Sequence, residues 1–207
     1  MVLSAHNVPR FLGIQLCERG RTALEFCMSI FRRLSRWLGA NDGMTHIASG
    51  NLAPGFTLRS LDGKEFSLSK ALGNGPVVLS FFKVSCPVCQ FTFPFLERLF
   101  QRYGGDGVTF LGVSQDDAGA SRDFAKKFGV TFPVLPDDSG YAVSNAYGLT
   151  MVPTIFLIEP DGKVRVSSMG FVRTDLESIA GSLADRRKIT RSPVFLSNES
   201  IPAIKPG

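Results

Sequence analysis

The amino-acid sequence predicts an α/β fold with a mixed central sheet and helices on both faces. Two short apolar runs, "PVVLSFF" (76–82) and "GVTFLGVS" (107–114), have the length and the β-branched content of buried strands. The segment between them repeats its apolar residues at helical spacing. A strand, a helix and a second strand in this order indicate a partly parallel sheet covered by helices. The 207 residues, 44% of them hydrophobic, suffice for one full-sized core.

The other elements follow from turn and capping signals along the chain. Two short strands are predicted within 55–69, around the turn Asp62-Gly63. The helix that begins at Pro87 is predicted to reach Tyr103, with Pro94 inside it. Further elements are a helix over 118–129 that ends at Gly129, two strands within 153–168 around Asp161-Gly162, and a helix over 174–188 capped by Thr174 or Asp175.

The first 43 residues form a basic leader. Within it, "TALEFCMSIFRRLSRWL" (22–38) has the spacing of a basic amphipathic helix, which would contact a membrane surface or a partner. It could equally pack on its own domain, or precede a true start at Met44. No signal peptide and no apolar span of membrane length is recognisable. The compartment stays open between a cytoplasmic or membrane-associated protein and one anchored at the periplasmic face.

Three regions are therefore expected: the leader at 1–43, a domain at 44–188, and a tail at 189–207 without regular structure. Much of the formal net charge of +5 comes from the arginines of the leader, and the remainder is nearly balanced. A balanced domain does not predict a nucleic-acid surface. No nucleotide, flavin or phosphate-binding motif is present, so no cofactor is expected.

The stretch "FFKVSCPVCQF" (81–91) places Cys86 and Cys89 at the junction of a strand and a helix. A helix N-terminus favours a thiolate, and Pro87 suits the first helical position because it needs no amide partner there. Cys89 lies one turn further along the same side of the helix. We expect Cys86 to attack and Cys89, less exposed, to resolve.

Other roles for the two cysteines must be weighed. A structural zinc site needs four ligands, yet no Cys or His follows Cys89 and the two histidines are His6 and His46. No metal is therefore expected. A copper-carrying domain would need a wider cysteine spacing and a distant His. Two merely buried thiols remain an alternative.

The motifs "PVVLSFFKVSCPVCQ", "GVTFLGVSQDD", "FPVLPDDSG" and "YGLTMVPTIFLIEPDGKV" resemble the thioredoxin superfamily over about residues 50 to 187. The pattern is most similar to its TlpA/ResA-type and AhpC/TSA (redoxin) branch. The resemblance implies a thioredoxin-like fold and a thiol-disulfide oxidoreductase that uses a reversible Cys86–Cys89 disulfide. It also implies a cis bond at Val152-Pro153, with the Val152 backbone beside the substrate.

The chain departs from the general thioredoxin pattern at two positions. Ser85 replaces the usual Trp before the first cysteine, and Ser80 replaces the usual buried Asp. Asp116 and Asp117 are candidate substitutes as proton acceptors, although loop carboxylates often only cap helices. Lys83 would lower the pKa of Cys86 through its charge, unless it is a solvated residue at the strand end.

Two alternative functions remain at this stage. In the peroxidase motif of peroxiredoxins, a Thr and a distant Arg activate the peroxide. Here Lys83 stands at the position of that Thr and Leu79 at that of the motif's Pro, and Arg173 is the candidate for the distant Arg. Direct peroxide reduction is thus the second choice, and a non-catalytic interaction module the third. Because Val88 adds no charge between the cysteines, we expect a reducing protein. Its partners would be a disulfide-containing protein substrate and a protein reductant.

Overall fold

The computed structural model describes residues 46–105 and 107–207. The predicted amphipathic helix at 22–38, with Cys27, lies outside the described residues, and so does the expected domain start at Met44. Among the described helices, none is both long enough and apolar enough to cross a membrane.

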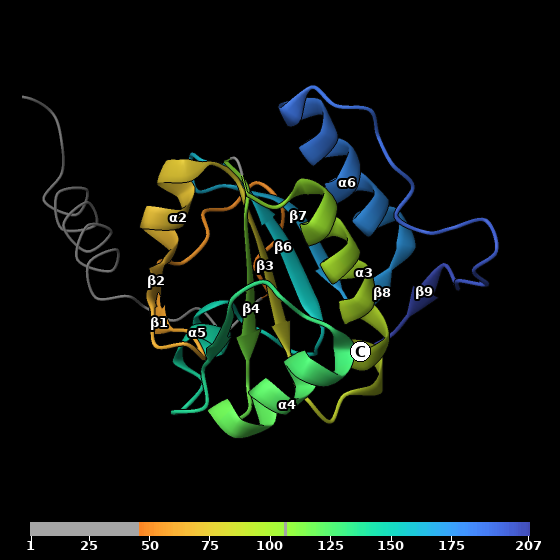
Figure 1. The fold of residues 1–207 in the computed structure, drawn as a ribbon. Coiled ribbons are helices and arrows are strands. Elements are labelled where there is room, and N and C mark those ends of the chain that lie inside the picture. Colours follow the sequence, from red (N-terminus) through yellow and green to blue (C-terminus); the bar gives the residue numbers. More distant parts are fainter. Residues whose placement is uncertain (1–45, 106) are drawn as a thin grey trace, which may run out of the picture. The chain divides into compact units, whose positions relative to one another are not determined.

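A five-stranded sheet with the order β5-β4-β3-β6-β7 forms the centre of the domain (Figure 1). Its strands are β3 (Val77–Phe82), β4 (Thr109–Ser114), β5 (Val134–Pro136), β6 (Thr154–Ile158) and β7 (Val164–Met169). The central strand β3 runs parallel to β4 and antiparallel to β6, so the predicted mixed sheet is confirmed. All six residues of β3 are buried, as its largely apolar sequence predicts, with Ser80 as the one polar residue among them.

Helices cover both faces of this sheet. Side chains alternate between the two faces along each strand, so both faces carry apolar residues that the helices bury. One face carries α3 (Pro87–Tyr103), α4 (Ala118–Phe128) and α6 (Arg173–Arg187). The other carries α2 (Leu68–Asn74) and α5 (Ala142–Ala146). Within β3, Val78 and Phe82 join the first core, whereas Val77, Leu79 and Phe81 join the second.

The predicted helices agree with the structure except at one end. α3 spans the predicted range, and α4 ends at Gly129, whose φ of 67° is the left-handed conformation of a helix C-cap. α6 begins at Arg173, and its N-cap residue Val172 makes no side-chain capping bond. The predicted caps Thr174 and Asp175 are therefore wrong: both residues lie inside the helix, because β8 leads directly into its first turn.

A small antiparallel pair precedes the main sheet. It consists of β1 (Thr57–Arg59) and β2 (Glu65–Ser67), paired across the predicted turn. Gly63 in that turn has a φ of 82°, a conformation that glycine adopts without strain.

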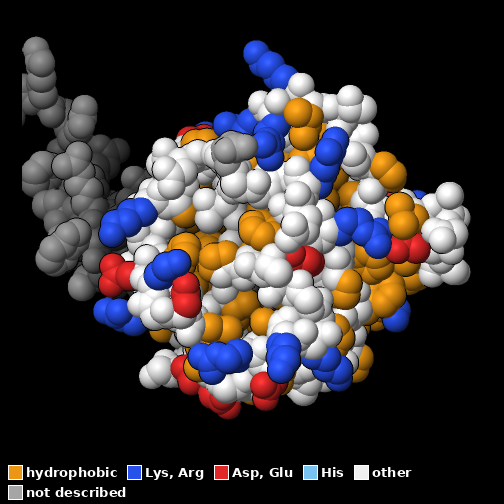
Figure 2. Space-filling model, viewed as in Figure 1, with side chains coloured by type: hydrophobic (Ala, Val, Ile, Leu, Met, Phe, Trp, Pro, Cys, Tyr) orange, Lys and Arg blue, Asp and Glu red, His pale blue; other side chains and the backbone are white. Residues whose placement is uncertain are grey.

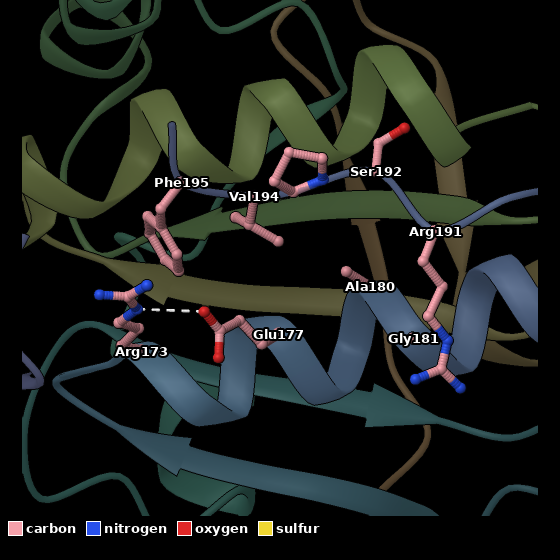
Figure 3. A pocket seen from close by; sticks show the side chains of 9 residues that line it. Arg173, Glu177, Ala180, Gly181, Arg191, Ser192, Val194 and Phe195 are labelled. Carbon is pink, nitrogen blue, oxygen red and sulfur yellow. Dashed lines mark hydrogen bonds and ion pairs between the residues drawn. The ribbon is translucent and has the colours of Figure 1, made fainter. Parts of the chain in front are cut away.

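The tail from residue 189 is more ordered than its composition suggests. Strand β8 (Phe171–Val172) pairs antiparallel with β9 (Ile204–Lys205). The expectation of a tail without regular structure is therefore wrong at Ile204 and Lys205. Val194 and Phe195 are buried against α6, and Figure 3 shows their side chains beside that helix. A two-residue strand carries no periodicity that a sequence pattern can reveal.

Charged side chains of both signs are mixed on the face drawn in Figure 2, where Lys and Arg lie among Asp and Glu and hydrophobic side chains reach the surface between them. The larger exposed hydrophobic residues include Leu196 and Ile204, both in the tail.

Candidate active site

Cys86 is the N-cap residue of α3. Its backbone is extended (φ −76°, ψ 117°), and its Sγ accepts a hydrogen bond of 3.3 Å from the amide nitrogen of Cys89. Pro87 occupies the first turn, and a 3.1 Å bond from the amide of Cys86 to the carbonyl of Lys83 closes the preceding turn. The Sγ atom therefore lies where the unpaired amides of a helix N-terminus stabilise negative charge.

The two thiols differ in exposure. Cys86 is half-buried, whereas Cys89 is fully buried. Burial raises the pKa of Cys89 far above that of a free thiol, and the neighbouring Cys86 and Asp116 act in the same direction. A hydrogen bond with the backbone of Lys83 offsets only part of this effect. Cys89 therefore stays protonated at neutral pH while Cys86 is accessible to solvent.

The segment before β6 lies against the dithiol. The thiol of Cys86 donates a hydrogen bond of 3.3 Å to the carbonyl oxygen of Val152, although the two residues are far apart in sequence. The peptide bond Val152-Pro153 is cis, and Pro153 is buried. The amide of Gly170 donates a 2.7 Å bond to the carbonyl of Pro153 and ties this segment to the start of β8.

The candidate supporting residues have distinct environments. Lys83 is exposed at the end of β3. Asp116 lies beside the dithiol, where its Oδ2 accepts a 2.7 Å hydrogen bond from the amide of Val84. Asp117 caps α4 by accepting a 2.9 Å bond from the amide of Ala120. Of the two carboxylates, only Asp116 contributes to the pKa shift of the buried thiol.

Ser80 and Arg173 do not form part of the site. Ser80 is buried in β3, and its Oγ donates a 3.2 Å hydrogen bond to the carbonyl of Leu111. It therefore holds the sheet together at the position where general thioredoxins carry an acid. Arg173 pairs with Glu177 on α6 and lines a different hollow, shown in Figure 3.

Gln90 is a site residue that the sequence analysis missed. Its Nε2 donates a 2.9 Å hydrogen bond to the carbonyl of Val84 and so fastens α3 to the loop before the dithiol. Val84 and Gln90 also border a hollow of about 290 Å³ whose other wall includes Phe124 and Phe128 of α4. No sequence signal marks Gln90, because its partner is a backbone atom.

The described residues contain no group of three or more His, Cys, Asp or Glu side chains placed to hold a metal ion. The two sulfurs of Cys86 and Cys89 lie together at this end of the sheet, where the Cys89 amide donates a hydrogen bond to Sγ of Cys86. An accessible thiol at a helix cap, with a buried thiol one turn behind it, carries out thiol-disulfide exchange. Fold and dithiol together define a thioredoxin-like thiol-disulfide oxidoreductase.

Comparison with known proteins agrees with this class. The sequence profile of the AhpC/TSA family matches residues 49–167, and the chain belongs to that family. It is 36% identical to the thiol-disulfide oxidoreductase ResA of Geobacillus thermodenitrificans over 141 residues, which cover 65% of this chain and 80% of the relative. Identity to ResA of Bacillus subtilis is also 36%, over 59% of this chain and 68% of the relative.

A solved structure from Chlorobium tepidum, described as a thiol:disulfide interchange protein DsbE, has the same fold. It superposes with a TM-score of 0.60 at 28% identity and covers 67% of this chain and 97% of its own. These relatives, like this chain, therefore belong among the thiol-disulfide oxidoreductases.

Proposed function

We propose that the protein reduces disulfide bonds in other proteins through a reversible Cys86–Cys89 disulfide. The observation that carries this proposal is the hydrogen bond of 3.3 Å between the amide of Cys89 and Sγ of Cys86. It holds the accessible sulfur at the helix N-terminus and keeps the buried thiol within one turn of it. Attack therefore belongs to Cys86 and resolution to Cys89.

The reaction proceeds by two exchanges. The Cys86 thiolate bonds to one substrate sulfur, and the second substrate sulfur leaves as a thiolate that takes up a proton. Cys89 then attacks Sγ of Cys86 and breaks the mixed disulfide. The first substrate sulfur leaves as a thiolate and takes up the proton that Cys89 has lost. The substrate has gained two electrons, and the enzyme is left with a Cys86–Cys89 disulfide that a protein reductant must reduce.

We propose that the backbone at Val152 docks the substrate. The carbonyl of Val152 lies 3.3 Å from Sγ of Cys86, so a peptide chain bound along this segment would bring its disulfide to the attacking sulfur. Backbone pairing of this kind recognises an extended segment with little regard to its side chains. Substrate choice would then depend on surfaces around the dithiol.

The test is to trap the mixed disulfide. Cys89→Ser should leave attack intact and stall resolution, so disulfide-linked adducts accumulate on non-reducing gels of a lysate from the source cell. Cys86→Ser should form none. The double variant Cys86→Ser/Cys89→Ser controls for adducts formed by Cys17 and Cys27, the two cysteines of the leader. Adducts on Cys86→Ser instead of Cys89→Ser would reverse the two roles, and equal, negligible trapping would favour a non-catalytic module.

A further inference from the structure

The end of the tail lies against the proposed docking segment. A Cβ atom built on Gly207 would stand only 2.4 Å from the carbonyl oxygen of Val152 and 3.5 Å from the Cβ of Met151. That oxygen also accepts the hydrogen bond from Cys86. Figure 1 shows the C-terminal end of the chain beside the first turn of α3. Residues 203–207, here called the strap, thus lie on the backbone next to the attacking cysteine.

The strap reaches this place as an extended strand. β9 pairs with β8, and the carbonyl of Ala203 accepts a 2.9 Å bond from the amide of Arg173. Next to the pair, a Cβ on Gly170 would lie 2.5 Å from the carbonyl of Lys205, so only glycine allows this close approach. The strap therefore has the backbone form of an extended peptide substrate.

The tail before the strap is anchored more firmly than the strap itself. Val194 and Phe195 are buried, and Phe195 packs against Phe95 and Phe171. Both terminal nitrogens (Nη1 and Nη2) of Arg98 donate to the carboxylate of Glu199, at 2.9 and 2.7 Å.

By contrast, β9 is only two residues long and Ile204 in it is 63% exposed. Within the strap, the side chain of Lys205 contacts Phe91, with its Nζ 4.4 Å from the ring centre. A short exposed strand opens at lower cost than a buried anchor. The strap can therefore lift while the rest of the tail stays in place.

We propose that the strap occupies the substrate position beside Val152 and must leave before an extended peptide binds. This inference rests on the proposed function and adds regulation to the same site. A site that is open in only a fraction of molecules binds its ligand more weakly by that fraction. The strap then slows exchange with extended peptide disulfides and leaves exchange with small disulfides unchanged, because those need only the sulfur of Cys86.

Two variants displace the strap in different ways. Gly207→Ala puts a methyl group against the backbone of Val152 and lifts the end of the strap, and a chain shortened after Pro202 removes it. Gly73→Ala is the matched control, because a Cβ there meets nothing within 4 Å. The assay compares kcat/KM for a disulfide-linked extended peptide with kcat/KM for hydroxyethyl disulfide.

We expect kcat/KM for the peptide to rise about fivefold in both strap variants, as for a site open in about a fifth of molecules, and to stay unchanged in Gly73→Ala. Turnover of hydroxyethyl disulfide should be equal in all four proteins. Equal or lower peptide turnover in Gly207→Ala would overturn the inference and show that the strap is neutral or part of the docking surface. If the shortened chain fails to fold, Gly207→Ala decides.

The failure of the proposed function would look different. Wild-type protein would then turn over neither substrate. Binding of an unreactive peptide with serine in place of cysteine still tests the strap: its Kd should be about fivefold lower in Gly207→Ala than in wild type. An unchanged Kd would refute the proposal that the strap blocks the peptide site, whatever the turnover measurements show.

Discussion

The carboxylate of Asp116 accepts a 2.7 Å hydrogen bond from the backbone amide of Val84, two residues before Cys86. The same carboxylate is one of the groups that raise the pKa of Cys89, after burial and the effects of Cys86. Asp116 therefore combines two effects at the dithiol. Its hydrogen bond positions the loop, and its charge opposes formation of the Cys89 thiolate.

Substitutions at Asp116 should separate these two effects. Asp116→Asn keeps an acceptor for the amide of Val84 and removes the charge, so the pKa of Cys89 should fall and resolution at neutral pH should become faster. Asp116→Ala also loses the hydrogen bond and should lower the free energy of unfolding by about 1–2 kcal/mol. The measurements are the pH dependence of mixed-disulfide resolution and urea unfolding. Slower resolution in Asp116→Asn would identify the carboxylate as the proton acceptor instead.

The two cysteines should react with alkylating reagents at different rates. Cys86 is half-buried at a helix cap, whereas Cys89 is fully buried with a raised pKa, and only the thiolate reacts. Reduced native protein should therefore be modified by iodoacetamide at Cys86 first, with Cys89 reacting only after unfolding or at strongly alkaline pH. Peptide mass analysis at increasing reaction times measures the order. Equal rates in the native state would contradict the assigned burial.

The candidate site could be predicted from sequence only where its signals are local. Pro87 after Cys86 indicates the helix start, and the apolar run of β3 indicates a strand that ends just before the dithiol. The proximity of Val152 to Cys86 has no local signal, and it was expected only through the family resemblance. The contact of Gly207 with Val152 was missed, because it depends on how a tail without periodicity packs on the finished domain. The start of α6 was misplaced because a two-residue strand, β8, precedes it directly.

Acid should loosen the anchor of the tail. The hydrogen bonds from Arg98 lower the pKa of Glu199 to about 2, helped by the amide of Leu196. Because the folded pKa lies below the unfolded value near 4.5, the stabilisation is complete above about pH 4.5 and is lost as the pH falls toward 2. The effect should be modest, since both side chains are partly exposed.

The amide resonance of Leu196 reports on this anchor in nuclear magnetic resonance spectra, because that amide bonds to Glu199. It should shift between pH 4.5 and 2 in the wild type. Glu199→Gln should remove the titration and keep an acceptor for the amide. A shift of the same size in both proteins would place the titrating group elsewhere.

Hydrogen peroxide should be a poor direct substrate. Peroxide reduction in the related peroxidase motif needs a threonine, and the exposed Lys83 stands at its position. Stopped-flow oxidation of the reduced protein should therefore be as slow as that of a free thiol and proportional to peroxide concentration. The substitution Lys83→Thr should not by itself create fast oxidation, because position 79 is still Leu instead of the motif's proline. Rapid, saturable oxidation of the wild type would make peroxidase activity the better proposal.

The leader should be dispensable for folding. The described residues from 46 onward contain the whole five-stranded sheet and the helices on both its faces, so a chain that begins at Met44 should unfold cooperatively and keep its activity. Contact of residues 22–38 with a membrane surface would then be a separate property, measured by binding of the full chain and the shortened chain to anionic vesicles.

A chain that begins at Ala48 provides the matched comparison for the chain that begins at Met44, because it also lacks His46 and Ile47. The hydroxyl of Ser167 donates a 2.7 Å bond to the carbonyl of Ile47, and His46 stacks on Phe156 with ring centres 5.5 Å apart. Loss of the hydrogen bond and of the buried apolar surface of Ile47 should lower the free energy of unfolding by about 1–2 kcal/mol relative to the Met44 start. Urea unfolding of both chains gives the difference. An insoluble or non-cooperative Met44 chain would show instead that residues of the leader complete the core.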